Sequence, residues 1–388
     1  MNKFKYPLAS STWDEKEIEA MQRVISRGHF TMGNETLEFE NKFASYLGVK
    51  HCVMVNSGSS ANLLMVATLM YSKRFSLKEG DEVIVPAVSW STTYFPFSQF
   101  GLKLVFVDVE SDTYNIDCGL IIKSITDRTR VICAVNLLGN PCDFDLLREI
   151  CDKNNILLIE DNCESLGAMY GGKHTGTFGL LGSFSFFFSH HISTMEGGMI
   201  ATDDEELFHI LLALRAHGWT RNLPHENQVT NTKDENAFNE AFNFVLPGYN
   251  LRPLELSAAI GIEQLEKLPK LIEGRRKNAS YCRTSMQNFG SVSLQREVGT
   301  SSWFAFGVLL DESTNRGEVL KRLEKAGIEC RPIAAGNFAK QPVISYLEHR
   351  VSCPLNNADR INTQGLFFGN SHLNLTDEID LLISILCS

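Results

Sequence analysis

The amino-acid sequence predicts an α/β fold with a mostly parallel sheet, helices on both faces, and a smaller C-terminal α/β domain. Between about residues 50 and 200, short β-branched runs alternate with helical patterns. Repeated strand–helix units of this length favour a parallel sheet. After about residue 291 the order becomes strand, helix, strand and final helix. A chain of 388 residues is long enough for one large domain and one smaller one.

The predicted elements follow from hydrophobic periodicity and turn residues. In the first half we expect strands at 51–58, 81–87, 102–110, 130–139 and 156–161, and helices at 59–71, 91–101, 117–125 and 144–155. In the second half we expect helices at 203–216, 253–290, 316–327 and 376–386, and strands at 301–310 and 328–333. The polar, asparagine-rich segment 222–250 lacks clean periodicity, and loops of this length are usually functional or disordered.

Composition excludes several classes of protein. The chain has 44% hydrophobic and 21% charged residues and a net charge of −10, without a clustered basic patch, which argues against a nucleic-acid surface. Residues 1–15 contain no apolar signal core, and no run of about eighteen apolar residues occurs, so we expect a cytoplasmic protein. The ten cysteines form no C-x-C or C-x-x-C pair, which disfavours disulfide frameworks and zinc ribbons.

Three segments place suggestive side chains at predicted strand ends, where open α/β sheets bind ligands. NSGSSAN, residues 56–62, offers free N–H groups at a helix start for a phosphate, or else a tight turn with serine caps. Trp90 can stack on a flat ring or belong to the core. In IEDNCES, Asp161 directly follows a strand and Glu164 comes three residues later. A carboxylate there can hold a protonated ring nitrogen or cap a helix.

A fourth segment, SFSFFFSHHISTMEGGMI, spans residues 183–200. In a strand, Ser183 and Ser185 share one face. Ser185 and His190 are five residues apart, so they can serve one site only if the chain turns at about Phe188 or Ser189. Neighbouring histidines rarely chelate one metal ion, and no third ligand follows at a suitable spacing, so we expect no metal. For His191 we favour a structural role.

In order and spacing, these segments resemble the fold-type I (aspartate aminotransferase-like) pyridoxal-phosphate enzymes that act on nucleotide-linked keto sugars. The resemblance runs from GHFTMGNETLEFENKFASYLGVKHCVMVNSGS through GYNLRPLELSAAIGIEQL to the C-terminal domain. It implies a large cofactor-binding domain at 1–265 and a small domain at 266–388. Most members of the family carry a lysine where this chain has His190. Without that ε-amine the cofactor cannot be tethered, so an ordinary transaminase is disfavoured.

Members with histidine in place of the lysine are C3 dehydratases of 4-keto-6-deoxy sugars. One kind acts on a CDP-linked sugar and holds an iron–sulfur cluster through cysteines in the region that matches 215–224 here. This chain has no cysteine between residues 163 and 282. The other kind acts on GDP-linked 4-keto-6-deoxymannose on the way to colitose and needs no cluster. SHHISTMEGG, RAHGWTRNLP, FVLPGYN and GIECRPI resemble that second kind.

The resemblance also implies the roles of individual residues. Pyridoxamine phosphate (PMP) would be bound non-covalently and regenerated by L-glutamate from pyridoxal phosphate (PLP). His190 would move the proton, and an imidazole near neutrality would be a ready base without pKa tuning. Cofactor contacts are expected from Gly58, Ser59, Trp90, Asp161, Glu164, Ser185 and, from a second subunit of a homodimer, Asn250. Substrate contacts are expected from His217, Arg221 and Arg331.

Two alternatives remain open at this point. The first is a 4-keto sugar aminotransferase with an unusual base, or a dehydratase for another nucleotide sugar. The second is a catalytically inactive, cofactor-binding regulator that lost its lysine. Cofactor-type residues at every other predicted position weigh against the regulator, because a fold alone does not require them.

Overall fold

A computed structural model describes residues 4–287 and 289–387, and its centre is an eight-stranded sheet. The strand order is β1–β9–β8–β5–β4–β2–β3–β15. Only β9 runs antiparallel to its neighbours, and the other adjacent pairs are parallel. The predicted mostly parallel sheet is therefore confirmed. The strands are β1 (His51–Val55), β2 (Glu82–Pro86), β3 (Lys103–Val107), β4 (Thr129–Val135), β5 (Leu157–Asp161), β8 (Gly182–Ser185), β9 (Gly198–Thr202) and β15 (His349–Val351).

Side chains of the central strands alternate between two apolar cores, one on each face of the sheet. Val83 and Val85 pack in a core shared with residues of α3 (Gly58–Tyr71), α4 (Ser91–Gln99) and α7 (Glu205–Arg215). Ile84, between them, packs in another core with residues of α5 (Cys118–Ser124) and α6 (Phe144–Asn154). This alternation follows from the two-residue period of a strand. It gives three layers, helix–sheet–helix, as the sequence predicts.

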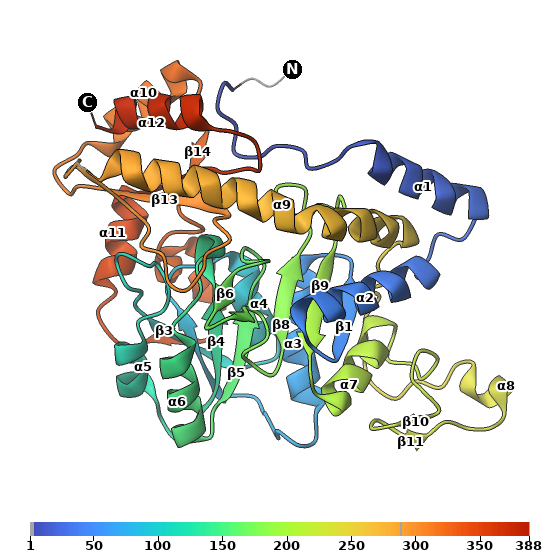
Figure 1. Ribbon diagram of the computed structural model, residues 1–388. Helices are drawn as coiled ribbons and strands as arrows, with labels where there is room; N and C mark the ends of the chain where they lie inside the picture. Colours follow the sequence, from blue (N-terminus) through green and yellow to red (C-terminus); the bar gives the residue numbers. More distant parts are fainter. Residues whose placement is uncertain (1–3, 288, 388) are drawn as a thin grey trace.

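The N-terminal part of the chain, before the first strand, is helical. Helices α1 (Glu15–Arg27) and α2 (Asn34–Leu47) pack against the 32-residue α9 (Glu255–Met286). Figure 1 shows α9 lying across the end of the sheet. The helix is continuous across residues 265 and 266, so the proposed division into two domains falls inside it. Residue 288, in the helix predicted for 253–290, lies outside the described residues.

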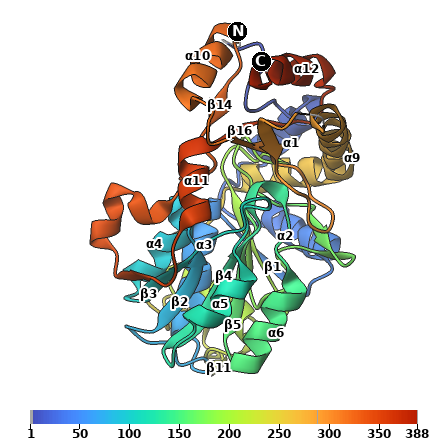
Figure 2. The same cartoon turned by 90° about the vertical axis from the view of Figure 1, so that its left-hand side faces the viewer.

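A second, antiparallel sheet forms the C-terminal part, with strand order β12–β13–β16–β14. Its strands are β12 (Val292–Leu294), β13 (Ala305–Leu310), β14 (Cys330–Arg331) and β16 (Gly365–Gly369). They share a separate core with α10 (Arg316–Ala326), α12 (Thr376–Leu386) and the end of α9. Figure 2 shows this part stacked above the central sheet. The predicted strand 328–333 shortens to Cys330–Arg331, because only these two residues pair with β16.

Short elements complete the chain. The segment 222–250 contains β10 (Glu226–Asn227), β11 (Asn231–Thr232) and α8 (Ala237–Glu240). Elsewhere lie β6 (Met169–Tyr170), β7 (Lys173–His174), α11 (Asn356–Gln364) and the 3₁₀ turns η1 (Leu137–Gly139), η2 (Phe338–Lys340) and η3 (Pro342–Tyr346). Among the described residues, no helix combines the length and apolarity that crossing a bilayer requires.

Candidate active site

A cavity of about 610 Å³ opens at the carboxyl ends of β4, β5 and β8, beside the start of α3. Residues after β14 and one side chain of β16 close its other side. Parallel sheets place ligand sites at this edge, because the loops that leave the strands meet there. Eight of the eleven residues predicted for the site line this cavity, namely Gly58, Ser59, Trp90, Asp161, Glu164, Ser185, His190 and Arg331.

The start of α3 forms a candidate anion-binding site. Ser57 caps the helix, and its hydroxyl accepts the Ser60 N–H at 3.1 Å. The first N–H groups of a helix have no intrahelical acceptor and attract phosphate. Gly58 allows close packing, since a Cβ there would lie 2.5 Å from the Cβ of Ser185. The glycine therefore lets the helix start and β8 meet, with the hydroxyl of Ser185 and that of Ser59 on the same cavity wall.

Asp161 ends β5 at the floor of the cavity and is only 6% exposed. Its carboxylate accepts hydrogen bonds from Asn62 Nδ2 at 2.8 Å and from Thr93 Oγ1 at 2.7 Å. The Cys163 N–H donates to the other oxygen at 3.2 Å. These donors come from α3, α4 and the loop after β5, so they fix the orientation of the carboxylate. A buried, oriented carboxylate of this kind suits a protonated ring nitrogen.

Glu164 accepts the backbone N–H of Leu138 at 2.9 Å. Burial raises the pKa of Glu164 to about 7, the nearby Asp161 charge adds to this, and the Leu138 hydrogen bond opposes it. The side chain is therefore partly protonated at neutral pH, and it can donate or accept a hydrogen bond in the cavity. Leu138 itself has a φ of 56°, a left-handed conformation that a branched residue rarely adopts.

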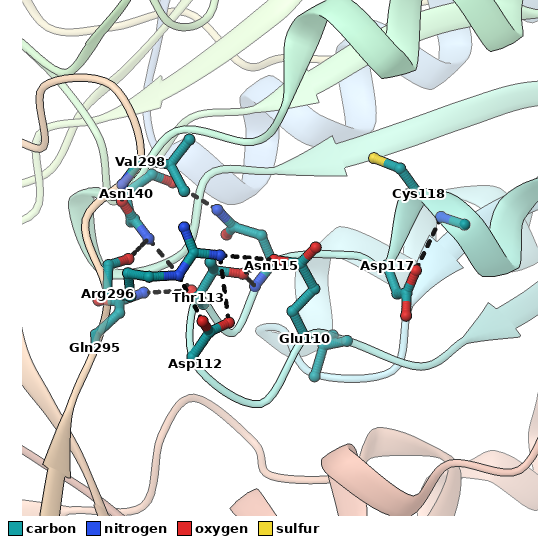
Figure 3. Close-up of polar contacts among 12 residues, drawn as sticks. Glu110, Asp112, Thr113, Asn115, Asp117, Cys118, Asn140, Gln295, Arg296 and Val298 are labelled. Carbon is teal, nitrogen blue, oxygen red and sulfur yellow. Dashed lines mark hydrogen bonds and ion pairs between the residues drawn. The ribbon is translucent and has the colours of Figure 1, made fainter.

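A polar cluster outside the cavity holds the Leu137–Leu138 turn in this conformation. Gln295 Nε2 donates to the carbonyl oxygens of Thr113 and Leu137, at 2.7 and 3.2 Å. Asn140 donates to the Arg296 carbonyl at 2.9 Å and accepts the Val298 N–H at 2.8 Å. Figure 3 shows how these contacts join the loop after β3, and Asn140 after β4, to the segment 295–298. This support was not predicted from the sequence, because its members are ordinary polar residues far apart in the chain.

Trp90 and Arg331 lie at the mouth of the cavity. Trp90 precedes α4, and its side chain is 59% exposed, so it does not belong to the core. A flat ring in the cavity could stack on it. Arg331 in β14 pairs with Glu329 at 2.9 Å and remains exposed. Arg331 is the one lysine or arginine among the residues that line the cavity in the described part of the chain.

His190 follows β8 through the predicted turn, since its N–H donates to the Phe187 carbonyl at 2.9 Å. Its Nδ1 is buried and has no hydrogen-bond partner within the described residues. The Phe304 ring approaches it edge-on, with centroids 5.1 Å apart. Burial, with a contribution from the charge of Arg275, lowers the pKa of His190 to about 3. The expectation of an imidazole that titrates near neutrality is wrong, because burial disfavours the charged ring and the charge of Arg275 adds to this effect.

His191 points elsewhere. Its side chain is 1% exposed, and its Nε2 lies 3.2 Å from the Ser302 carbonyl oxygen. It does not line the cavity. The structural role favoured for His191 agrees with this burial.

Three predicted residues do not line the cavity of the single chain: Asn250, His217 and Arg221. Asn250 is exposed and accepts a hydrogen bond from Arg252 Nε at 3.0 Å. Arg221 lies over the Trp219 ring, 4.2 Å from its centroid. Conversely, Phe187, Cys163, Glu196 and Phe304 line the cavity without having been predicted. The aromatic run before His190 was the available signal for Phe187, but no pattern marked Phe304.

Known proteins match this chain over nearly its full length. Residues 11–386 match the DegT/DnrJ/EryC1/StrS aminotransferase family. The GDP-4-keto-6-deoxy-D-mannose 3-dehydratase of Yersinia pseudotuberculosis is 54% identical over 384 residues, or 98% of each chain. The structure of the Escherichia coli enzyme of that name with bound hydrated PLP has a TM-score of 0.97 and 52% identity, covering 99% of each chain.

A further structure of a GDP-4-keto-6-deoxymannose-3-dehydratase contains a trapped PLP–glutamate geminal diamine. It has a TM-score of 0.97 and 52% identity, and covers 98% of this chain and all of that one.

Proposed function

This chain belongs to the DegT/DnrJ/EryC1/StrS aminotransferase family, and we propose that it removes the C3 hydroxyl of GDP-4-keto-6-deoxy-D-mannose with PMP as cofactor. The observation that carries this proposal is the position of His190 in the cavity, with its Nδ1 buried and without a hydrogen-bond partner among the described residues. No lysine lines the cavity in the described part of the chain, so the chain offers no amine there to tether PLP. The reaction belongs to the route to GDP-colitose.

The cavity residues fit PMP and PLP. The tight contact of Gly58 with Ser185 leaves the N–H groups at the α3 start and the hydroxyls of Ser59 and Ser185 for the phosphate. Trp90 would stack on the ring and Asp161 would hold the ring nitrogen. Glu164, with its pKa of about 7, would share a proton with the ring hydroxyl. When bound, PMP supplies an amine that condenses with the C4 ketone and a ring that withdraws electrons.

His190 moves the proton in this scheme. A low pKa keeps the imidazole neutral at pH 7, so it is free to take a proton from the 4′ carbon of the cofactor. The same low pKa makes the resulting imidazolium a strong acid. It would therefore give its proton readily to the C3 hydroxyl, which leaves as water. Hydrolysis of the unsaturated amino sugar then yields the 3-deoxy ketone and ammonia.

Ammonia release consumes the amine, and L-glutamate would restore PMP in a second half-reaction. The trapped PLP–glutamate species of a relative supports this donor. Arg331, as the cavity cation, would bind the diphosphate of the sugar nucleotide. We further propose a cytoplasmic homodimer with shared sites, in which Asn250 of the partner subunit completes the phosphate seat. His217, whose N–H donates to the carbonyl of Tyr249 next to Asn250, and Arg221 would contact the nucleotide sugar.

Ammonia release tests the proposal. Purified enzyme with GDP-4-keto-6-deoxymannose, PLP and glutamate should release ammonia and consume glutamate in equal amounts. His190→Asn should bind PMP and the sugar nucleotide but release ammonia at least about 100-fold more slowly, the usual contribution of a general acid–base group. His225→Asn, an exposed histidine outside the cavity, is the matched control and should keep the wild-type rate.

His190→Lys separates dehydration from transamination. The lysine should trap PLP covalently, which the absorbance spectrum and borohydride reduction detect, and it should abolish ammonia release. A normal rate of ammonia release in either His190 variant refutes the assignment of the base. An aminated sugar as the main product of the wild-type enzyme identifies it as an aminotransferase instead.

A further inference from the structure

Asn62 in α3 is a buried amide that connects this helix to two strands of the central sheet. The residue is 5% exposed. Its Nδ2 donates to Asp161 Oδ2 at the end of β5 at 2.8 Å, and its Oδ1 accepts the hydroxyl of Ser183 in β8 at 2.6 Å. Burying an amide costs free energy unless its polar atoms are hydrogen-bonded, and both ends of this amide are bonded.

Ser183 fixes the direction of this amide. A serine has one hydroxyl hydrogen. Ser183 Oγ lies 3.5 Å from both Asp161 Oδ1 and the Glu160 carbonyl oxygen. It is much closer to Asn62 Oδ1, at 2.6 Å, so the amide oxygen takes the hydrogen. The NH₂ end of the amide then faces Asp161, whose carboxylate can only accept. Ser183 itself is fully buried and does not line the cavity, so any effect it has on the site passes through its neighbours.

A second donor reaches the same carboxylate oxygen from α4. Thr93 Oγ1 donates to Asp161 Oδ2 at 2.7 Å, and the Ser89 hydroxyl lies 2.8 Å from Thr93 Oγ1. Since Thr93 gives its one hydrogen to the carboxylate, Ser89 is the donor in the second contact. With Asn62, Oδ2 therefore accepts two hydrogen bonds, which fills the acceptor positions of one carboxylate oxygen. Oδ1 accepts the Cys163 N–H at 3.2 Å and keeps one position free.

We propose that Asn62 is a positioning residue for Asp161: fixed by Ser183, its amide helps to saturate Oδ2 and leaves Oδ1 to receive the protonated ring nitrogen of PMP. The inference rests on the proposed function, in which Asp161 holds that nitrogen. It adds which oxygen does so and which side chains select it. A carboxylate held from α3 and α4 cannot rotate, so less freedom is lost when the ring binds.

Replacing the ring nitrogen isolates the contact that Asn62 controls. Isothermal titration calorimetry gives the dissociation constants of PMP and of its 1-deaza analogue, which has C–H in place of the ring nitrogen. Wild-type enzyme should prefer PMP about 100-fold, the value of a hydrogen bond between charged groups. Asn62→Leu keeps the side-chain size but removes both contacts, and it should reduce this preference about tenfold by weakening PMP. Ser183→Ala should reduce it about threefold, since the amide stays but loses its own partner.

Thr68→Val is the matched control in the same helix. Thr68 is fully buried, and its hydroxyl has no hydrogen-bond partner within the described residues, so valine removes no contact. The preference for PMP and the rate of ammonia release should stay at wild-type values in this control. Asn62→Leu should lower the kcat of ammonia release about 10- to 100-fold, the usual effect of losing a partner that orients a functional group. The KM for the sugar nucleotide should not change.

The outcomes separate this inference from the proposed function. A wild-type preference for PMP in Asn62→Leu overturns the inference, and so does an equal loss of affinity for PMP and the 1-deaza analogue, which a purely structural role would give. An unchanged preference in Ser183→Ala overturns the relay through Ser183, and it overturns the whole inference if Asn62→Leu does not fold. Equal binding of the two ligands by wild-type enzyme would instead refute the role of Asp161 in the proposed function. Normal ammonia release by His190→Asn would refute the proposed reaction, whatever these affinities show.

Discussion

Replacing Gly58 by alanine is expected to weaken the binding of PMP, because the phosphate seat depends on the missing side chain. A Cβ at residue 58 would lie 2.5 Å from Ser185 Cβ, 2.9 Å from Ser185 Oγ and 3.0 Å from Cys163 Sγ. The hydroxyl and the thiol can rotate away, but Ser185 Cβ is fixed by the backbone of β8. Since carbon atoms pack at about 3.5–4.0 Å, the start of α3 and β8 must separate by about 1 Å.

This displacement determines how much PMP affinity the variant should lose. A shift of about 1 Å breaks at least one charge-assisted hydrogen bond between the helix start and the phosphate, worth about 1.5–3 kcal/mol. The dissociation constant of PMP should therefore rise about 10- to 150-fold. Overpacking should also cost about 1–3 kcal/mol of folding stability.

Isothermal titration calorimetry of ligand-free enzyme with PMP measures the constant, and a thermal unfolding scan reports the stability. Gly290→Ala is the control, since a Cβ there meets no atom within 4 Å. Both quantities should stay at wild-type values in that control. A folded Gly58→Ala enzyme that binds PMP within about threefold of wild type would show that the close approach of α3 to β8 does not form the phosphate seat.

Two further predictions concern titrating carboxyls. Two hydrogen bonds from Arg350 hold the pKa of Glu82 at about 2 instead of 4.5, so their stabilisation is present above pH 4.5 and fades as the pH falls towards 2. Glu82→Gln should lower the free energy of unfolding by about 3 kcal/mol at pH 7. Amide hydrogen exchange at residues 349–351 should become about 100-fold faster, and an unchanged exchange rate would contradict this prediction. The pKa of Glu164 is raised from 4.5 to about 7, so the ligand-free fold loses stability as the pH rises from 4.5 to 7, and the loss is complete above 7. Glu164→Gln keeps an acceptor for the Leu138 N–H. It should raise the melting temperature at pH 8 but not at pH 4.5. Equal shifts of the melting temperature at both pH values would contradict a Glu164 that titrates between them.

Local patterns determined much of the fold. Alternating β-branched runs and helical patterns located β1 to β5 and the helices between them, because each run buries a face within its own few residues. The N-terminal helices α1 and α2 were not predicted, although Asp14 and Glu17 form a capping box that the sequence displays. The three-residue β15 offered no such signal, since its place at the sheet edge depends on pairing with β3.

In the candidate site, too, some features followed from local sequence patterns and others depended on tertiary packing. Strand-end positions identified Asp161, Glu164 and Trp90, and counting residues from Ser185 to His190 required the turn that the structure contains. The electrostatic state of His190 was not predictable, because its burial depends on tertiary packing and the charge of Arg275 comes from a distant segment.

The sequence by itself determined the alternation of strands and helices from β1 to β5, the residues at the sheet's carboxyl edge, and the absence of a lysine at residue 190. Only the tertiary structure decided how those residues behave. It gave Glu164 a pKa of about 7 and His190 one of about 3, from the same burial acting on groups of opposite charge. The physical reason is that desolvation and through-space charge depend on which distant segments pack together, and no local pattern in the chain encodes that packing.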